Sequence, residues 1–183
     1  MEIHQETETP HHMNRLGHQA AAQATWLSIC SYEQLYGDWH LGWQHVVAGA
    51  VVASSMCADD WSPDADQGGV MAKIIPGGHR GPTHMPELVF AVLYGLSLVL
   101  TPDLDWFLMA AAAAWGSHLA ADFLFGGIPF ALATLTGNSR RIGAGFKTGG
   151  KVEKVLTGTL TALSLPLAYI AVGGNIPFQY PGA

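Results

Sequence analysis

Charged side chains are scarce in this sequence. Asp, Glu, Lys and Arg make up 12% of the 183 residues, about half the share in an ordinary soluble domain. The remaining charge is unbalanced, because 8 Lys and Arg face 14 Asp and Glu and give a net charge of -6. A nucleic-acid-binding surface needs a basic stripe to neutralise phosphates, so we expect no nucleic acid as a stable partner. With 49% of residues hydrophobic, the composition instead favours a lipid bilayer as the partner.

Cysteine and the common catalytic motifs are also scarce. Cys30 and Cys57 stand alone in apolar stretches, so we expect buried thiols and no thiolate zinc site or dithiol redox centre. The sequence has no Walker-type glycine loop, Gly-x-Ser-x-Gly elbow or dinucleotide fingerprint, so nothing supports phosphate-loop, serine-hydrolase or nicotinamide chemistry. Residues 1–12 are polar and acidic without the pattern of a signal peptide, which predicts a disordered tail.

Five apolar segments follow this tail, and Gly, Pro, Asp or Asn lies near most of their ends. They cover residues 17–31, 44–58, 87–101, 106–125 and 155–173. All five have helical character, and no linker divides them. The sequence therefore predicts an all-α fold: a single membrane-embedded helical bundle of about four to five helices over residues 13–173, followed by a tail at 174–183.

The ends and lengths of these segments carry further information. Thr83 and Pro86 predict a cap and a first-turn proline for the third segment, and Gly126-Gly127 predict the end of the fourth. A full crossing needs about 20 apolar residues, which only the fourth and fifth segments approach. The shorter three are compatible with tilted crossings, with an interfacial position or with a soluble bundle.

Positive charge predicts how the chain is oriented in an inner membrane. Five of the Lys and Arg residues lie between the fourth and fifth segments: Arg140, Arg141, Lys147, Lys151 and Lys154. The positive-inside rule places that loop in the cytoplasm. If every segment crosses, this multi-pass arrangement collects on the cytoplasmic side His18, Asp64, Asp66, His79, His84, His118 and Asp122. It leaves on the opposite side Asp38, His40, His45, Asp103 and Asp105.

Two of the collected groups have the chemistry of a metal site. His118 and Asp122 are four residues apart in a helical stretch, so both project from one face, either as two metal ligands or as a buried hydrogen-bonded pair. The turn from His79 to His84 adds two imidazoles and Arg80, whose guanidinium suits a phosphate. The alternative for this turn is a polar loop that caps the next helix through Thr83.

Acidic residues extend the candidate site. Asp64 and Asp66 follow an apolar helix, and carboxylates are hard ligands that can bridge two divalent ions. Glu153 lies just before the last apolar segment. It is compatible with a ligand, a base or an ordinary first-turn acid favoured by the helix dipole.

Several of these elements recur together in one known family. They are Gly17-His18, Pro63-Asp64-Ala65-Asp66, Gly78-His79-Arg80-Gly81-Pro82-Thr83-His84, Ser117-His118 through Asp122, and Gly150 through Glu153. In order and spacing they resemble the YdjM-type family of membrane-bound metal-dependent hydrolases over residues 13–173. The resemblance implies a helical metal-dependent hydrolase of the inner membrane. The chain departs from the family pattern at Gln67 and Met85, where the family commonly has His and Ser. A more remote resemblance to the zinc phospholipase C and P1 nuclease group favours phosphoester cleavage.

The resulting hypothesis is a hydrolase in which His18, Asp64 or Asp66, His84, His118 and Asp122 hold one or two zinc-like ions. The ions would activate a water molecule to attack a phosphoester, in a small-molecule, lipid or lipid-linked substrate. Arg80 would bind the substrate's anionic oxygens, His79 would be a ligand or proton carrier, and Glu153 would orient a ligand or act as a base. The alternatives are a non-catalytic membrane protein with a structural metal and a small transporter, although the one-sided clustering opposes the transporter.

Overall fold

The computed structural model describes residues 13–37, 41–57, 82–131 and 141–174. Within these ranges it has no β-strand and has five α-helices, each of which falls on one of the five apolar segments: α1 (Arg15–Tyr36), α2 (Trp43–Ser55), α4 (Pro86–Ser97), α5 (Asp105–Phe125) and α7 (Lys151–Ala171). Two short 3-10 turns, η2 (Pro82–His84) and η3 (Pro102–Leu104), precede α4 and α5. The prediction of an all-α fold with about five helices is confirmed.

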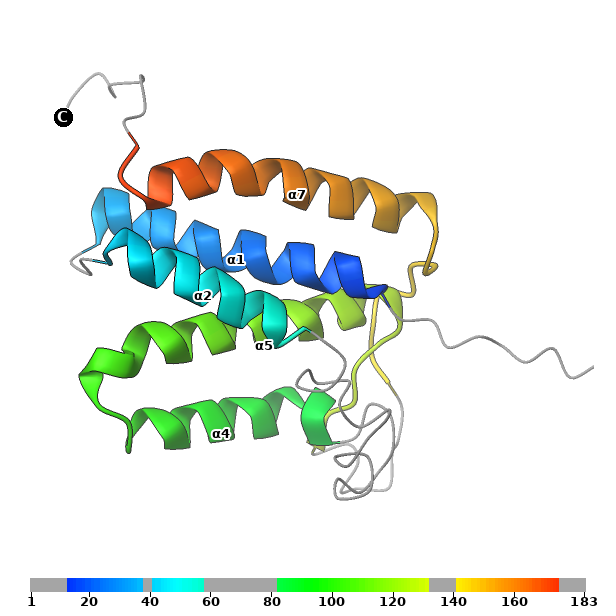
Figure 1. Cartoon of the computed structure of the whole chain (residues 1–183). Coiled ribbons are helices and arrows are strands. Elements are labelled where there is room, and N and C mark those ends of the chain that lie inside the picture. Colours follow the sequence, from blue (N-terminus) through cyan, green and yellow to red (C-terminus); the bar gives the residue numbers. More distant parts are fainter. Residues whose placement is uncertain (1–12, 38–40, 58–81, 132–140, 175–183) are drawn as a thin grey trace, which may run out of the picture.

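The helices lie side by side, and helices that follow one another in the chain run in opposite directions (Figure 1). α1 packs against α2, α5 and α7, whereas α4 packs against α5. This alternation brings the beginnings of α1, α4 and α7 to the same end of the bundle as the end of α5. His45 lies in the first turn of α2, Asp103 in η3 and Asp105 at the start of α5, so these three lie at the other end, as the sequence predicts. Asp38 and His40, predicted for the same side, lie outside the described residues.

One apolar core joins α1, α2, α5 and α7, and Trp26 of α1 is its largest member. Its indole N–H donates a hydrogen bond to the carbonyl of Val46 at 2.9 Å. Gly49 of α2 lies directly on the indole ring, and a Cβ there would overlap it. On α5 the buried core positions are small, namely Ala110, Ala113 and Ala114. Small residues at these contacts let the helix backbones approach closely.

The helix ends follow most of the signals read from the sequence. Pro86 occupies the first turn of α4, and Gly126 caps the end of α5 with Gly127 at φ 78°. Both predictions are confirmed, since a left-handed φ of this kind favours glycine. The cap predicted for Thr83 is wrong. The N-cap of α4 is Met85, and the Thr83 hydroxyl lies instead 3.1 Å from Nδ1 of His84.

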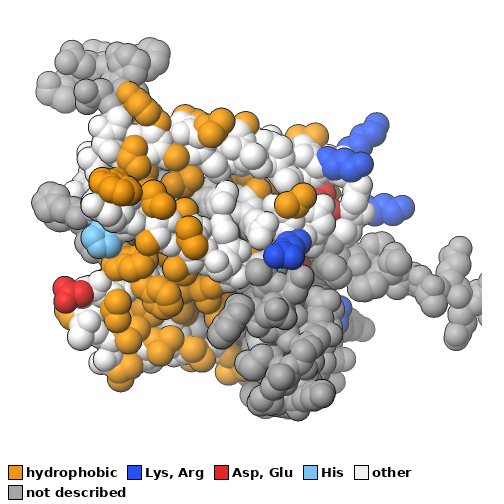
Figure 2. Space-filling view, viewed as in Figure 1, with side chains coloured by type: hydrophobic (Ala, Val, Ile, Leu, Met, Phe, Trp, Pro, Cys, Tyr) orange, Lys and Arg blue, Asp and Glu red, His pale blue; other side chains and the backbone are white. Residues whose placement is uncertain are grey.

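Two stretches are long and apolar enough to cross a membrane, by length and composition alone: Pro102–Phe125 and Lys151–Ala171. The first is 56% buried inside the bundle, as the core helix of a soluble protein would be. The second, α7, is only 6% buried, so its apolar side chains cover the surface of the protein. Figure 2 shows apolar side chains spread over much of one face, with Lys and Arg gathered at the end where α7 begins.

Candidate metal centre

The candidate site is built on the last two turns of α5. His118 and Asp122 project from one face of this helix, and Nε2 of His118 lies 3.4 Å from Oδ2 of Asp122. Both side chains are almost completely buried, at 1% exposure each. A carboxylate and an imidazole removed from water in this way need partners nearby. The fold supplies these partners from two other elements.

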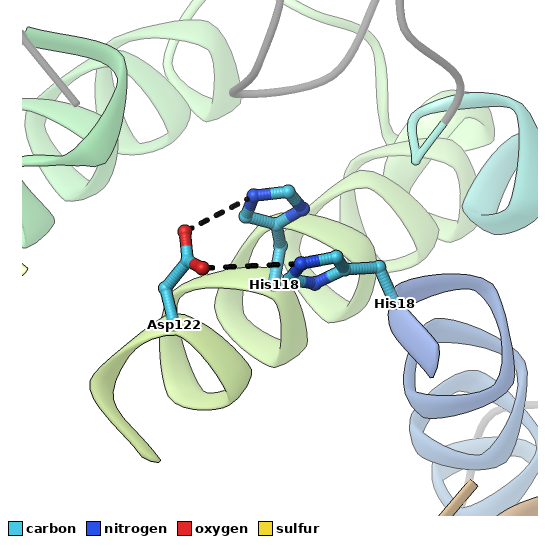
Figure 3. A group of neighbouring side chains, drawn as sticks. All are labelled: His18, His118 and Asp122. Carbon is cyan, nitrogen blue, oxygen red and sulfur yellow. Dashed lines mark ion pairs between the residues drawn. The ribbon is translucent and has the colours of Figure 1, made fainter. Parts of the chain in front are cut away.

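His18, on the first turns of α1, supplies the second imidazole (Figure 3). Its ring stacks on that of His118, with ring centroids 3.8 Å apart and an angle of 14° between the planes. Its Nε2 lies 3.9 Å from Oδ1 of Asp122. The position of His18 follows from the cap of α1, because the Asn14 side chain accepts the N–H of Gly17 and the Asn14 carbonyl accepts the N–H of His18.

His84 supplies the third imidazole from η2, just before α4. Its Nε2 lies 3.2 Å from Oδ2 of Asp122, and its ring meets the His118 ring edge-on at 5.5 Å. One hydrogen bond holds this turn against α5, and one contact within the turn orients the His84 ring. The Trp115 indole N–H donates to the carbonyl of Thr83 at 3.0 Å, and the Thr83 hydroxyl contacts the other ring nitrogen of His84.

Three Nε2 atoms thus surround one carboxylate, at 3.2, 3.4 and 3.9 Å. Ligands of a tetrahedral zinc ion, each about 2.0–2.1 Å from the metal, lie about 3.3 Å from one another. The donor atoms of His18, His118 and Asp122 all lie within 4.8 Å of one another, so one ion could contact all three. Imidazole and carboxylate together suit zinc or another divalent transition metal. A buried group able to hold a metal ion is therefore present, as the sequence predicts for these residues.

Glu153 lies at the same end of the bundle, but its carboxylate contacts the backbone. One oxygen accepts the N–H of Asn14 at 2.8 Å and the other accepts the N–H of Gly149 at 2.6 Å. The side chain is completely buried. These bonds tie the beginning of α7 to the cap that positions His18, which agrees with an orienting role.

The structure brings together four of the six metal ligands predicted from the sequence: His18, His84, His118 and Asp122. The other two, Asp64 and Asp66, lie outside the described residues, as do His79 and Arg80. Sequence reasoning missed Asn14 and Trp115, which position two of the imidazoles. An Asn before a helical stretch is a recognised cap signal, and it was available for Asn14.

Comparison with known proteins adds nothing to this geometry, because no protein-family model, curated protein or solved structure matches the chain. The resemblance to the YdjM-type family stays a prediction. The case for a function therefore depends on the contacts of the described residues.

Proposed function

We propose that this protein is a metal-dependent hydrolase of the inner membrane that cleaves a phosphoester in a lipid or lipid-linked substrate. The YdjM-type resemblance points to the same class. A bound divalent ion would supply Lewis acidity and lower the pKa of a coordinated water toward neutrality. The residues of the chain would hold the ion and position the substrate.

The observation that carries this proposal is the convergence of three imidazoles on the buried Asp122 carboxylate. Each imidazole comes from a different part of the chain, since His18 lies on α1, His84 on η2 and His118 on α5. A simple salt bridge would need only one imidazole for one carboxylate. Three imidazoles within 3.9 Å of one buried carboxylate, with exposures of 2% or less, are better explained by a shared cation.

The exposed apolar surface supports the membrane setting. On α4 and α7 large apolar side chains face outward, including Phe90, Tyr94, Leu98, Val155, Leu165 and Tyr169. Extensive exposed apolar surface of this kind marks a membrane or protein interface. α7 has 21 residues, so it measures about 30 Å, close to the hydrocarbon thickness of a bilayer. Under the positive-inside rule, the Lys and Arg near the start of α7 would place the metal centre on the cytoplasmic side.

The remaining predicted residues complete the proposed site. Arg80 would bind the anionic oxygens of the substrate, and His79 would be a ligand or carry a proton. Asp64 or Asp66 would allow a second ion, since carboxylates can bridge two metals. Glu153 acts through Asn14 on His18, so we assign it a positioning role.

Metal analysis tests the proposal directly. The protein is purified in detergent, and its zinc, manganese and iron contents are measured for wild type, His118→Ala, His84→Ala and His45→Ala. We expect bound metal in wild type and in His45→Ala, whose imidazole lies at the opposite end of the bundle, and loss of metal in the other two. Hydrolysis of lipid and nitrophenyl phosphoesters is assayed on the same samples. Undiminished metal in His118→Ala and His84→Ala would refute the site.

A non-catalytic protein with a structural metal is the second candidate, and a specific observation favours it. His18, His84, His118 and Asp122 are four donors, which is the number that closes a tetrahedral structural site. Substituted cobalt distinguishes the two candidates, because its visible spectrum depends on coordination number. A spectrum that changes when inorganic phosphate is added indicates an open position and supports the hydrolase. An unchanging four-coordinate spectrum, without phosphoester cleavage, supports the structural role.

A further inference from the structure

A second candidate site lies at the end of α5, the helix that carries His118 and Asp122. It is a pocket of about 500 Å³ between the last residues of this helix and the segment 141–147. The residues that line it are Phe125, Gly126, Gly127, Arg141, Gly143, Gly145, Phe146 and Lys147. Its size falls within the range of small-ligand sites.

The lining of the pocket is suited to an anion. Arg141 and Lys147 bring two positive charges, and none of the described residues that line the pocket is acidic. Phe125 and Phe146, whose rings are 6.2 Å apart, form an apolar wall. Guanidinium and ammonium groups that meet in one concave site bind phosphate oxygens through charge-assisted hydrogen bonds.

The backbone adds further donors. The N–H groups of Ile142, Ala144 and Phe146 donate to carbonyls of residues 123–128, which fixes the segment on the end of α5. Among the hydrogen bonds of the described residues, the intervening N–H groups of Gly143 and Gly145 have no acceptor. Both glycines line the pocket. A Cβ on Gly143 would overlap the carbonyl of Phe123, so this close approach requires glycine.

The pocket is joined to the metal centre through Asp122. The backbone carbonyl of Asp122 accepts the N–H groups of Gly126 and Gly127, at 2.8 and 2.7 Å, and both of these glycines line the pocket. Phe125 follows Asp122 by three residues, about 4.5 Å along the helix axis, and lies on nearly the same face. The pocket and the metal centre therefore lie at the same end of α5.

We infer that this pocket binds a phosphate group, held by Arg141, Lys147 and the backbone N–H groups of Gly143 and Gly145. The identification with the phosphate of a substrate rests on the proposed function, whereas anion binding itself does not. Phosphate is a tetrahedral anion with several oxygens, so it can accept hydrogen bonds from both side chains and from the backbone together. The phosphate could belong to a lipid head group or to a soluble compound, and the two sources can be separated experimentally.

Calorimetric titration of the full chain in detergent micelles tests the inference. The probes are inorganic phosphate and dihexanoyl phosphatidic acid, each added to metal-loaded and to chelator-treated protein. The variants are Arg141→Gln and Lys147→Gln, which alter the pocket, and Lys151→Gln and Lys154→Gln, which remove nearby charges that do not line it. We expect each pocket variant to weaken phosphate binding roughly ten-fold or more, and each control variant to change it less than two-fold. Thermal unfolding checks that every variant is folded.

Each outcome has a defined meaning. Equal weakening by all four variants would show general attraction to a basic surface and would overturn the pocket, as would unchanged binding in both pocket variants. Tighter binding of phosphatidic acid than of inorganic phosphate assigns the pocket to a lipid head group, and equal binding assigns it to a soluble phosphate. If chelator-treated protein still binds phosphate through Arg141 and Lys147 but metal-loaded protein cleaves no phosphoester, the pocket stands and the proposed function fails. If cleavage occurs but the pocket variants bind phosphate normally, the pocket fails alone.

Discussion

Replacing Asp122 by Asn tests the metal centre most sharply, because one nearly isosteric change removes the charge at which three imidazoles converge. All three Nε2 atoms lie within 3.9 Å of its carboxylate. Asn keeps the shape of the side chain and one acceptor oxygen, and its amide N–H can donate to the unprotonated nitrogen of a neutral imidazole, so the metal-free protein should still fold. The substitution should act on metal affinity.

The expected magnitude follows from linkage between binding and folding. At a free zinc concentration of 100 times the wild-type Kd, binding stabilises the native state by about 2.7 kcal/mol. Loss of an outer-shell partner of a metal typically weakens binding 10–100-fold, so loss of a ligand should cost about 100-fold or more. The same zinc concentration then stabilises Asp122→Asn by about 0.4 kcal/mol. For a chain of this length the rise in Tm on adding zinc should fall from about 5–11 °C to about 1–2 °C.

The assay is thermal unfolding in detergent with and without zinc, with His45→Ala as the matched control. His45 is exposed and lies against Trp106 at the other end of the bundle. The His45→Ala variant should therefore show the same rise in Tm on adding zinc as wild type. An equal rise in wild type and Asp122→Asn would show that zinc binds elsewhere and would refute the reasoning.

Three further predictions concern the supports of the site, the membrane surface and the core. In Glu153→Gln the amide N–H must face one of the two backbone N–H groups that the carboxylate now accepts. The free energy of unfolding of the metal-free protein should therefore fall by about 1–3 kcal/mol, and titration with zinc should show a lower affinity. Leu165→Lys places a charge on an outward-facing site that is 77% exposed. In a bilayer this charge should raise the free energy of membrane insertion by about 2.5–3.5 kcal/mol and reduce the fraction of protein that stays in the membrane after carbonate extraction. Val152→Lys, in the first turn of α7, should be tolerated. If both lysine variants behave alike, α7 does not span. Gly49→Ala overlaps a buried indole and should destabilise by about 1–2 kcal/mol in denaturant unfolding, whereas Gly158→Ala, which has open space, should not destabilise.

Helix positions and the gathering of polar residues at one end could be predicted from the sequence, because both follow from local rules. Apolar segments bounded by Gly and Pro marked every described helix, and strict alternation of direction placed His18 and His118 at the same end. The length rule was less informative for α1. This helix has 22 residues, but the polar residues Glu33 and Gln34 follow the apolar stretch, so only residues 17–31 were recognised as an apolar segment.

The contacts within the site could not be predicted, because they depend on packing between distant segments. The sequence placed Thr83 as a cap, whereas the turn at Pro82–His84 directs its hydroxyl to the His84 ring. It left three roles open for Glu153, and only the distances to Asn14 and Gly149 distinguish among them. In the sequence, only the positive charge of residues 141–147 indicated a binding site there. The concave shape of the pocket arises from glycines that lie against the end of α5, a tertiary contact.

The stacking of His18 on His118 bears on the number of ions. Rings that are 3.8 Å apart and nearly parallel, with both Nε2 atoms toward Asp122, direct their lone pairs side by side and not at a common point. The spacing of the donor atoms would allow one ion to contact both rings and Asp122 once one ring turns, whereas a second ion would need further carboxylate ligands such as Asp64 or Asp66. His18 is the ring whose backbone is fixed from outside the site, through Asn14 and Glu153. The hydrogen bonds at the start of α1 hold the backbone of His18, so we expect Glu153 to influence metal binding without contact with the ligands.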